Sequence, residues 1–279
     1  MTVKLNVLLT ELNLTYKQVR PSLRLHLKEL LAIKQQPMKI LYISKLKKML
    51  SVQNLKVSIG EVQILKGIDM EVPSGELHAI MGPNGSGKST FCHAVMGNPD
   101  YEQSGSIQIG DTDISKLPQY ERSSAGIFQS FQYPVGLPGV TLNEYVNEIN
   151  PGLSNDEILE LSRKFNVEQF LSRDVNVDLS GGEKKRSELF QLAIKKPKVA
   201  LLDEIDSGLD IDAIKSVSGL INENRNEDTS YILVTHYSRI LKYLNVDQVH
   251  IVVQGNVIKS GGEELIEEVD SNGYTQYQE

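Results

Sequence analysis

Two glycines, a lysine and a serine near residue 85 form the pattern in this sequence most able to do chemistry. Gly82, Gly87, Lys88 and Ser89 match the spacing G-x-x-x-x-G-K-[ST] of a phosphate-binding loop. In such a loop, backbone N–H groups and the N-terminus of the following helix bind the negative charge of a phosphate chain. The alternative is a glycine turn without a ligand. We interpret the pattern as a nucleotide site formed by Gly82, Pro83, Asn84, Gly85, Ser86, Gly87, Lys88, Ser89 and Thr90.

The flanking residues predict the two elements that a phosphate loop requires. Residues 76–81 are a short, mostly apolar run typical of a buried strand. Residues 89–96, closed by Gly97, are typical of a short helix. In this context Lys88 would reach the β- and γ-phosphates, and the Ser89 hydroxyl would hold Mg²⁺.

Two further apolar runs end in residues that could take part in phosphate chemistry. Residues 199–204 end in Asp203 and Glu204, and residues 232–236 end in His236. Runs of this kind are typical of buried parallel strands, and ligands of α/β sheets gather at the carboxyl ends of such strands. Asp203 is therefore a candidate Mg²⁺ ligand, and Glu204 is a candidate for orienting a water molecule. A buried core histidine is the alternative for His236.

Residues 179–186 predict the start of a helix that could face an anion. Ser180 can cap this helix, and Gly181 and Gly182 leave its N-terminus bare. By itself the segment is also compatible with a helix start that contains a glycine hinge.

The remaining pattern predicts strands first and helices later. Residues 50–58 and 62–72 alternate apolar and polar side chains, as half-exposed antiparallel strands do. Residues 105–111 predict a strand that enters a tight turn, and residues 127–134 an apolar strand that runs into a proline-marked loop. Residues 140–177 have helical periodicity, with Ser154 or Asn155 as a possible N-cap.

Composition bounds the class of protein. A chain of 279 residues fits one large domain or two modest ones, and 40% apolar residues suffice for a hydrophobic core. A lone cysteine, Cys92, excludes a disulfide framework and a zinc site built on cysteines, and it fits a reducing compartment. No apolar run approaches the ~20 residues of a membrane span. We expect a soluble protein without a secretory signal.

Charge separates the first 48 residues from the rest. Residues 1–48 hold 10 Lys and Arg against 2 Glu, whereas the remainder holds 19 against 34. The acidic body argues against nucleic-acid binding. The basic segment places leucines at helical spacing behind Pro21. It could be a targeting peptide, a membrane-surface or partner helix, or an artefact of a start that belongs at Met49.

Taken in order, these motifs resemble the ATP-binding cassette (ABC) ATPases over about residues 50–260. The resemblance includes a glutamine loop at Gln132 and a Ser-Gly-Leu-Asp turn that ends at Asp210. The details resemble one branch, the SufC ATPases of iron–sulfur cluster assembly. Transport proteins of this family usually carry Gln where this chain has Glu183. The Glu-Lys-Lys-Arg run at residues 183–186 is therefore the most discriminating short segment.

The resemblance implies an α/β fold with a mixed sheet core, an antiparallel β subdomain and a short helical subdomain. It implies an ABC ATPase domain over residues 49–265, with the helical subdomain at about 136–180. Residues 1–48 would be a basic extension, and residues 266–279 a C-terminal tail.

The resemblance also implies the roles of the site residues. ATP is the substrate, and Mg²⁺ would be served by Ser89, Gln132 and Asp203, directly or through water. Glu204 would be the general base or water-positioner and His236 would contact the γ-phosphate, so that Glu204, His236 and Lys88 form the catalytic set. In a transient head-to-tail homodimer, the second nucleotide would be contacted by Ser180, Gly181, Gly182 and Asp210.

The implied function is to couple ATP hydrolysis to iron–sulfur cluster assembly, with SufB- and SufD-like scaffold proteins as partners. One alternative is a nucleotide-binding subunit of a membrane transporter. Another is a regulatory ABC protein that acts on ribosome or DNA, and the acidic body of the chain argues against this second alternative. The expected location is the cytoplasm, or an organellar stroma or matrix if residues 1–48 are a targeting peptide.

Two features depart from the family pattern, and a lysine of the Glu-Lys-Lys-Arg run is a candidate for regulating the isolated subunit. Ile59 stands where the family commonly stacks an aromatic side chain on adenine, which puts adenine selectivity in doubt. Only 47 residues separate Gln132 from Ser180, which is short for the helical subdomain. Lys184 or, preferably, Lys185 could pair with Glu204 or Asp206 and so inhibit the isolated subunit.

Overall fold

The strands of the first sheet alternate buried and exposed side chains, and the buried ones belong to one of the two hydrophobic clusters of the described residues. The computed structural model describes residues 48–277, so the predicted N-terminal extension lies almost wholly outside the described residues. The chain divides into two units, residues 1–47 and 48–279, and all the described elements belong to the second unit. The strand order of the first sheet is β2-β1-β4-β5 and all its pairings are antiparallel. Its strands are β1 (Lys48–Ile59), β2 (Val62–Pro73), β4 (Glu102–Ile109) and β5 (Thr112–Asp113).

The second sheet carries the strands expected to end at the site. Its order is β12-β11-β3-β10-β9-β6, in which β12 is an antiparallel edge and the other neighbours run parallel. Every residue of β3, β9 and β10 is buried, as expected for strands covered on both faces. The bounds are β3 (Leu77–Met81), β6 (Ile127–Ser130), β9 (Val199–Asp203), β10 (Ser230–Val234), β11 (Gln248–Val253) and β12 (Asn256–Gly261).

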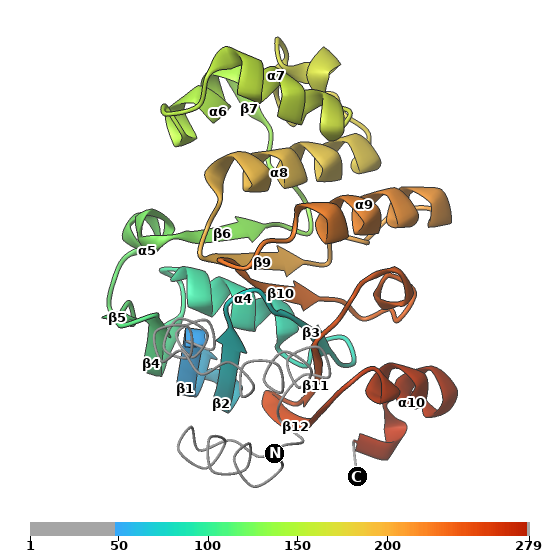
Figure 1. Cartoon of the computed structure of the whole chain (residues 1–279). Helices are drawn as coiled ribbons and strands as arrows, with labels where there is room; N and C mark the ends of the chain where they lie inside the picture. The colour runs from blue at the N-terminus through green and yellow to red at the C-terminus, as the bar shows by residue number, and fades with distance from the viewer. Residues whose placement is uncertain (1–47, 278–279) are drawn as a thin grey trace, which may run out of the picture. The chain divides into compact units, whose positions relative to one another are not determined.

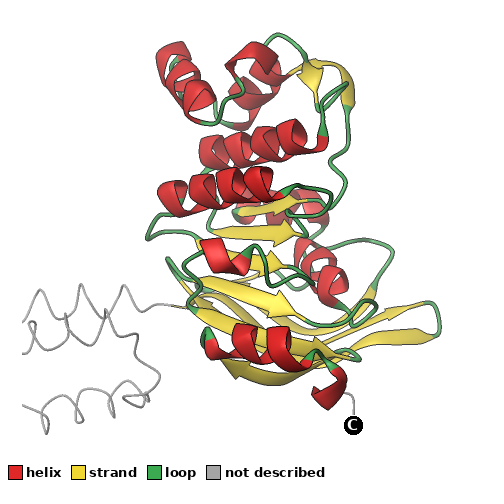
Figure 2. Ribbon diagram, turned by 90° about the vertical axis from the view of Figure 1, so that its right-hand side faces the viewer, coloured by secondary structure: helices red, strands yellow, loops and turns green. Residues whose placement is uncertain are grey.

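Two hydrophobic clusters fill the opposite faces of the second sheet. Within β9, Val199 and Leu201 belong to the cluster shared with the first sheet and α4 (Lys88–Met96). Ala200 and Leu202 belong to the other cluster, which the remaining long helices cover. This alternation follows from the two-residue period of a strand. The helices that follow α4 are α5 (Gln119–Ala125), α6 (Leu142–Ile149), α7 (Asn155–Lys164), α8 (Gly181–Lys195), α9 (Ile211–Asn224) and α10 (Glu264–Asn272). Figures 1 and 2 show α6, α7, α8 and α9 stacked on one side of the second sheet, whereas Figure 1 shows α5 beside β6 and α10 beside β12.

The region predicted as helical, 140–177, is helical only in part. Ser154 is the N-cap of α7 and forms a capping box with Glu157, so the first of the two predicted caps is the right one. A two-stranded sheet of β7 (Leu137–Thr141) and β8 (Asp174–Val175) overlaps both ends of this region. Three short 3₁₀ helices complete the described elements: Glu168–Phe170, Leu241–Tyr243 and Thr275–Tyr277.

The C-terminal boundary expected after residue 265 falls inside helix α10. Leu265, Ile266 and Val269 of this helix are buried in the cluster that also contains Leu77 and Leu202. The helix therefore packs on the domain and is not a free tail. Within residues 48–277, no helix is both long enough and apolar enough to cross a membrane.

Candidate nucleotide-binding site

The phosphate loop joins β3 to α4 in a conformation that needs its glycines. Gly85 and Gly87 have φ values of 76° and 102°, which only glycine adopts readily. A Cβ atom on Gly87 would lie 2.6 Å from a methyl carbon of Leu65, and one on Gly82 would lie 2.0 Å from the Val252 carbonyl oxygen. The loop therefore packs too closely on β2 and β11 for side chains at these two positions. It leads directly into α4, whose first N–H groups are available to bind an anion.

Lys88 is held inside the loop that it would serve. Its side chain is buried, and Nζ donates hydrogen bonds to the carbonyl oxygens of Gly82 and Pro83, each at 2.9 Å. Burial lowers the pKa of Lys88, whereas the nearby carboxylates Glu204 and Asp203 raise it. The ammonium group of Lys88 is thus held in a fixed position within the phosphate loop.

Asp203 and Ser89 meet at the carboxyl end of β9. The Ser89 hydroxyl donates a hydrogen bond to Asp203 Oδ1 at 2.9 Å. Asp203 is almost fully buried, and burial raises its pKa, against the lowering effect of the Ser89 hydrogen bond. A hydroxyl beside a carboxylate is a hard oxygen donor set of the kind that Mg²⁺ prefers. The residues present therefore fit the metal expected here.

Glu204 takes a strained backbone conformation next to Asp203. Its φ is 44°, unusual for a residue with a side chain, and its N–H donates to the Val234 carbonyl at 2.9 Å. Gln132 Nε2 donates to Glu204 Oε2 at 2.5 Å. His236 Nδ1 lies 3.4 Å from Glu204 Oε1 and makes no hydrogen bond among the described residues. Glu204 is thus flanked by Gln132 and His236.

These residues line one cleft of about 290 Å³. Its lining residues come from the phosphate loop, the glutamine loop and the ends of β9 and β10: Asn84, Gly85, Gly87, Lys88, Ser89, Thr90, Gln132, Glu204 and His236. The structure therefore brings together the predicted catalytic set and the predicted metal set, with Asp203 joined through Ser89. Ile59, which stands where an aromatic neighbour of adenine is expected, is the exposed last residue of β1 and is not among the residues that line this cleft.

The residues expected to act across a dimer lie outside the cleft. Ser180 is the N-cap of α8 and forms a capping box with Glu183. Ser180 and Gly181 are exposed, and Gly182 is partly exposed. Asp210 is the exposed N-cap of α9, and its carboxylate accepts from the Ala213 N–H at 2.8 Å. Within one subunit these side chains cap helices and leave the nucleotide cleft to other residues.

The predicted pairing of Lys185 with Glu204 or Asp206 is wrong for this structure. Lys185 Nζ instead lies 3.6 Å from Glu188 Oε2 and donates to the carbonyl oxygens of Phe131 and Gln132. The reason is geometric, because Glu188 is three residues further along the same helix and therefore on the same face. Lys184, the alternative, is partly exposed.

Sequence reasoning missed one side chain beside the expected metal site. His93 Nε2 lies 3.7 Å from Asp203 Oδ2, and His93 Nδ1 is 3.2 Å from the Tyr101 hydroxyl. His93 follows Ser89 by four residues on α4, so it occupies the same helix face. That spacing is a signal in the sequence that could have identified it.

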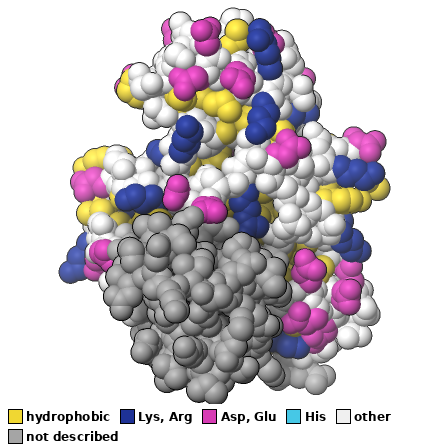
Figure 3. All heavy atoms as spheres, in the orientation of Figure 1, with side chains coloured by type: hydrophobic (Ala, Val, Ile, Leu, Met, Phe, Trp, Pro, Cys, Tyr) yellow, Lys and Arg dark blue, Asp and Glu magenta, His cyan; other side chains and the backbone are white. Residues whose placement is uncertain are grey.

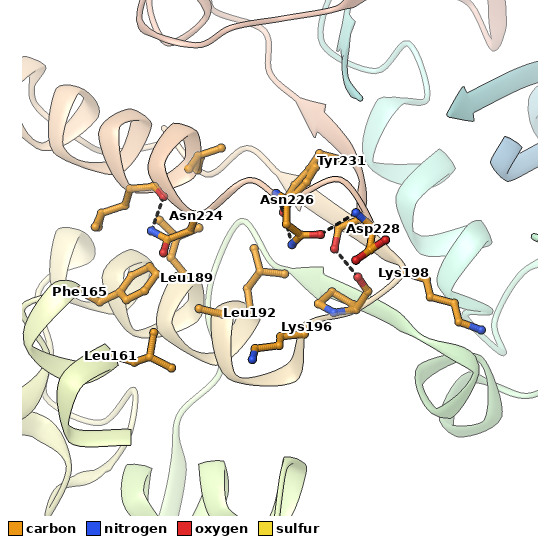
Figure 4. A pocket seen from close by; sticks show the side chains of 15 residues that line it. Leu161, Phe165, Leu189, Leu192, Lys196, Lys198, Asn224, Asn226, Asp228 and Tyr231 are labelled. Carbon is orange, nitrogen blue, oxygen red and sulfur yellow. Dashed lines mark hydrogen bonds between the residues drawn. The ribbon is translucent and has the colours of Figure 1, made fainter. Parts of the chain in front are cut away.

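A larger cavity of about 450 Å³, drawn in Figure 4, lies near the amino-terminal ends of β9 and β10, whereas the nucleotide cleft lies at their carboxyl ends. Lys198, Thr229 and Tyr231 line it near the starts of β9 and β10, away from the phosphate loop. Apolar side chains from α7, α8 and α9, including Phe165 and Leu189, cover much of its wall. The size of a cavity therefore does not identify the nucleotide site in this protein, whereas the glycine loop and the strand ends do.

The fold and the family comparison agree on the class of protein. A family model described as "ABC transporter" matches residues 65–207. A solved structure titled as the ADP conformation of an ATP-binding cassette of an ABC transporter superposes with a TM-score of 0.69 at 25% identity. It covers 82% of this chain and 97% of the other. A bacterial Atm1-family ABC exporter with ATP bound shares the fold, with a TM-score of 0.68 at 22% identity over 83% of this chain and 41% of the exporter. The protein is an ABC-type ATPase.

Curated relatives identify the branch. "Probable ATP-dependent transporter SufC" of Escherichia coli (strain K12) is 41% identical over 241 residues, or 81% of this chain and 97% of the relative. "Probable ATP-dependent transporter ycf16" of Guillardia theta is 43% identical over 243 residues, or 82% and 96%. "Vegetative protein 296" of Bacillus subtilis (strain 168) is 44% identical over 238 residues, or 81% and 91%. The chain belongs to the SufC family of ABC ATPases.

Proposed function

We propose that this ATPase drives iron–sulfur cluster assembly on a scaffold of SufB- and SufD-like proteins. The observation that carries the proposal is the 41% identity to the SufC relative over 97% of its length. The Glu-Lys-Lys-Arg run at residues 183–186, which sets the SufC branch apart from transport proteins, supports it. The single cysteine is buried, which suits a reducing compartment such as the cytoplasm or an organellar stroma or matrix.

In the proposed mechanism, the loop amides and Lys88 bind the phosphates of ATP. Ser89, Asp203 and Gln132 would hold Mg²⁺, which neutralises developing charge on the phosphate oxygens when bound. Glu204 accepts a proton from, or orients, the attacking water, and Gln132 fixes the Glu204 carboxylate through its hydrogen bond. His236 lies on the other side of Glu204, where it can contact the γ-phosphate. Catalysis then consists mostly of positioning and electrostatic stabilisation.

Hydrolysis in this proposal takes place in a transient head-to-tail homodimer. Ser180 and Gly181 are exposed at the N-terminus of α8, where backbone N–H groups favour an anion. Asp210 is exposed at the start of α9. Because these residues do not line the cleft of their own subunit, a second subunit's nucleotide is the ligand that they fit.

Exposed apolar side chains near the glutamine loop suit the scaffold partner. Tyr133 is 77% exposed and Val135 is 69% exposed. Figure 3 shows hydrophobic side chains gathered in the upper part of the face drawn, at the level of the helical subdomain. A contiguous exposed apolar patch is typical of an interaction site, whereas single scattered apolar side chains are a normal feature of a protein surface.

Co-purification with candidate partners tests this function. The full chain would be produced with SufB- and SufD-like proteins of the same organism, and the complex would be isolated and its ATPase rate measured. We expect a stable complex and a rate at least several-fold above that of the isolated chain. The Tyr133→Ala/Val135→Ala variant should lose the complex and keep the basal rate. Absence of a complex at micromolar concentrations, with ATP hydrolysis intact, would refute the assembly function.

The second candidate is the nucleotide-binding subunit of a membrane transporter. It is supported by the names of two relatives, which describe them as probable ATP-dependent transporters. Isolation of the chain from its own cells distinguishes the two functions. A membrane-embedded partner in the purified complex would favour transport, and a scaffold partner would favour cluster assembly.

A further inference from the structure

A buried ion pair on α8 faces the main chain at the end of β6. Lys185 and Glu188 are 2% and 4% exposed. Burial lowers the pKa of Lys185 and raises that of Glu188, while each partner opposes the shift of the other. A buried pair of charges is costly to desolvate and adds little stability by itself, so its position calls for another reason.

The pair binds three successive residues of the chain that leads into the cleft. Lys185 Nζ donates to the carbonyl oxygens of Phe131 and Gln132 at 2.5 and 3.1 Å. Glu188 Oε2 accepts from the Ser130 hydroxyl at 2.7 Å, and Oε1 accepts from the Phe131 N–H at 3.2 Å. Hydrogen bonds to charged groups are stronger than those between neutral groups. The segment is therefore fixed to α8 both through its carbonyl oxygens and through its hydrogen-bond donors.

The segment ends at a residue of the active cleft. The Gln132 side chain lines the cleft and donates to Glu204. The same helix α8 begins directly after Ser180, whose neighbours Gly181 and Gly182 are its first residues. Ser180, Gly181 and Gly182, which are proposed above to contact a second subunit's nucleotide, are called the signature residues here. One helix therefore carries the signature residues at its start and holds Gln132 through its second turn.

We propose that Lys185 and Glu188 are positioning residues that clamp Gln132 to α8. Through this clamp, a movement of the signature end of α8 toward a second subunit's nucleotide also moves Gln132 against Glu204 in its own cleft. Neither residue lines the cleft. The coupling across two sites rests on the head-to-tail dimer proposed above, whereas the clamp itself stands on the contacts within one subunit.

Hydrogen–deuterium exchange tests the clamp independently of hydrolysis. In the Lys185→Met variant, which keeps the aliphatic stem, amides of residues 127–134 should exchange at least tenfold faster than in the wild type. Lys195→Met is the matched control, because Lys195 is a partly buried lysine of the same helix whose Nζ contacts the Ser123 hydroxyl instead. Exchange at 127–134 should stay at the wild-type rate in this control.

ATPase kinetics test the positioning role. Lys185→Met should lower kcat at least tenfold and raise the Mg²⁺ concentration for half-maximal activity several-fold. Affinity for a fluorescent ATP analogue in EDTA should remain within twofold, because the phosphate loop is untouched. Glu188→Gln, which keeps the shape and one acceptor, should show the same pattern more weakly, and it serves as the second variant if Lys185→Met does not fold.

The outcomes separate the two proposals. Wild-type exchange at residues 127–134 in both folded variants would overturn the clamp, whatever the ATPase rates are. An equal loss of kcat in Lys195→Met would also overturn it, since the effect would then belong to the helix as a whole. If the wild-type chain formed no complex with a scaffold, the proposed function would fail, while the exchange experiment would still decide the clamp.

Discussion

The cleft concentrates opposite charges around a bare loop of backbone amides. Lys88 is the buried cation at its base, and Asp203 and Glu204 are carboxylates that act on the pKa of this lysine. The Lys88 ammonium group donates hydrogen bonds to the carbonyl oxygens of Gly82 and Pro83. A phosphate chain would replace these neutral acceptors with charged ones, which bind an ammonium group more strongly.

Replacement of Lys88 by Ala should remove this attraction. We expect ATP affinity to fall roughly ten- to a hundredfold, in line with about 1.5–3 kcal/mol for a hydrogen bond to a charged group. Hydrolysis should fall below detection, since developing charge on the phosphate oxygens loses its fixed cation. Titration with a fluorescent ATP analogue and a phosphate-release assay measure both effects. The exposed Lys116→Ala is the control, and wild-type hydrolysis by Lys88→Ala would contradict the assignment.

Substitution of Glu204 by Gln should separate binding from chemistry. The Gln132 hydrogen bond can persist because the amide oxygen still accepts it, whereas the amide cannot take a proton from water. We expect kcat to fall about 10²–10⁴-fold, the range of general-base catalysis, with little change in ATP affinity. With Mg²⁺ and ATP the variant should accumulate as a dimer in light scattering. A normal hydrolysis rate in the variant would remove the general-base role, and Glu160→Gln, on an exposed part of α7, is the control.

At the scale of elements, a pair of buried histidines links β3, the strand that leads into the phosphate loop, to its neighbour β11. His78 of β3 and His250 of β11 lie on neighbouring parallel strands, with Nδ1 of His78 3.0 Å from Nε2 of His250. Nδ1 of His250 is 2.7 Å from the Ser260 hydroxyl of β12. Burial, aided by His78, lowers the pKa of His250 to about 3. The imidazole therefore stays neutral in the folded protein over most of the acidic range.

This lowered pKa predicts a loss of stability in mild acid. Because the unfolded protein binds a proton at His250 near pH 6.5 and the folded one only near pH 3, stability falls as the pH drops between these values. The contribution at pH 5 is roughly 2 kcal/mol below that at pH 7. Urea unfolding of the wild type and of His250→Gln at both pH values measures it. The variant should lose about that much less than the wild type, and equal losses would show that His250 does not titrate as stated.

At the scale of the whole molecule, the cleft and the hydrophobic clusters of the described residues are built by the body that begins at Lys48. The described lining residues of the cleft lie between Asn84 and His236, and the first buried residues of the two described clusters are Leu50 and Leu77. β1 begins at Lys48, which pairs with Pro73, so a truncation should retain residue 48. The relatives of the SufC family align with about four fifths of this chain.

Removal of residues 1–47 should therefore leave ATP hydrolysis and thermal stability unchanged. The expected change in kcat is less than twofold. The melting temperature should shift by no more than about 2–4 °C, which is the effect of a change of about 1 kcal/mol in the free energy of unfolding of a domain of this size. Calorimetry and the phosphate-release assay on residues 48–279 measure this. A drop in melting temperature of ten degrees or more would show that the segment packs on the body.

The sequence by itself determined the chemistry of the site and the elements that carry it. The phosphate loop, the paired carboxylates at residues 203 and 204 and the strand-end His236 are local patterns, and local spacing fixes a loop, a strand end or a cap. The buried runs that became β3, β9 and β10 follow from the same logic, because a strand covered on both faces has to be apolar throughout.

Only the tertiary structure decided which distant groups meet. Helical spacing makes Glu188 available to Lys185, but only the packing of α8 against the end of β6 excludes Glu204 and Asp206 as its acceptors. The positive φ of Glu204 likewise exists because its N–H bonds to Val234 on a neighbouring strand. Such contacts arise between segments more than 20 residues apart, where packing overrides local propensity.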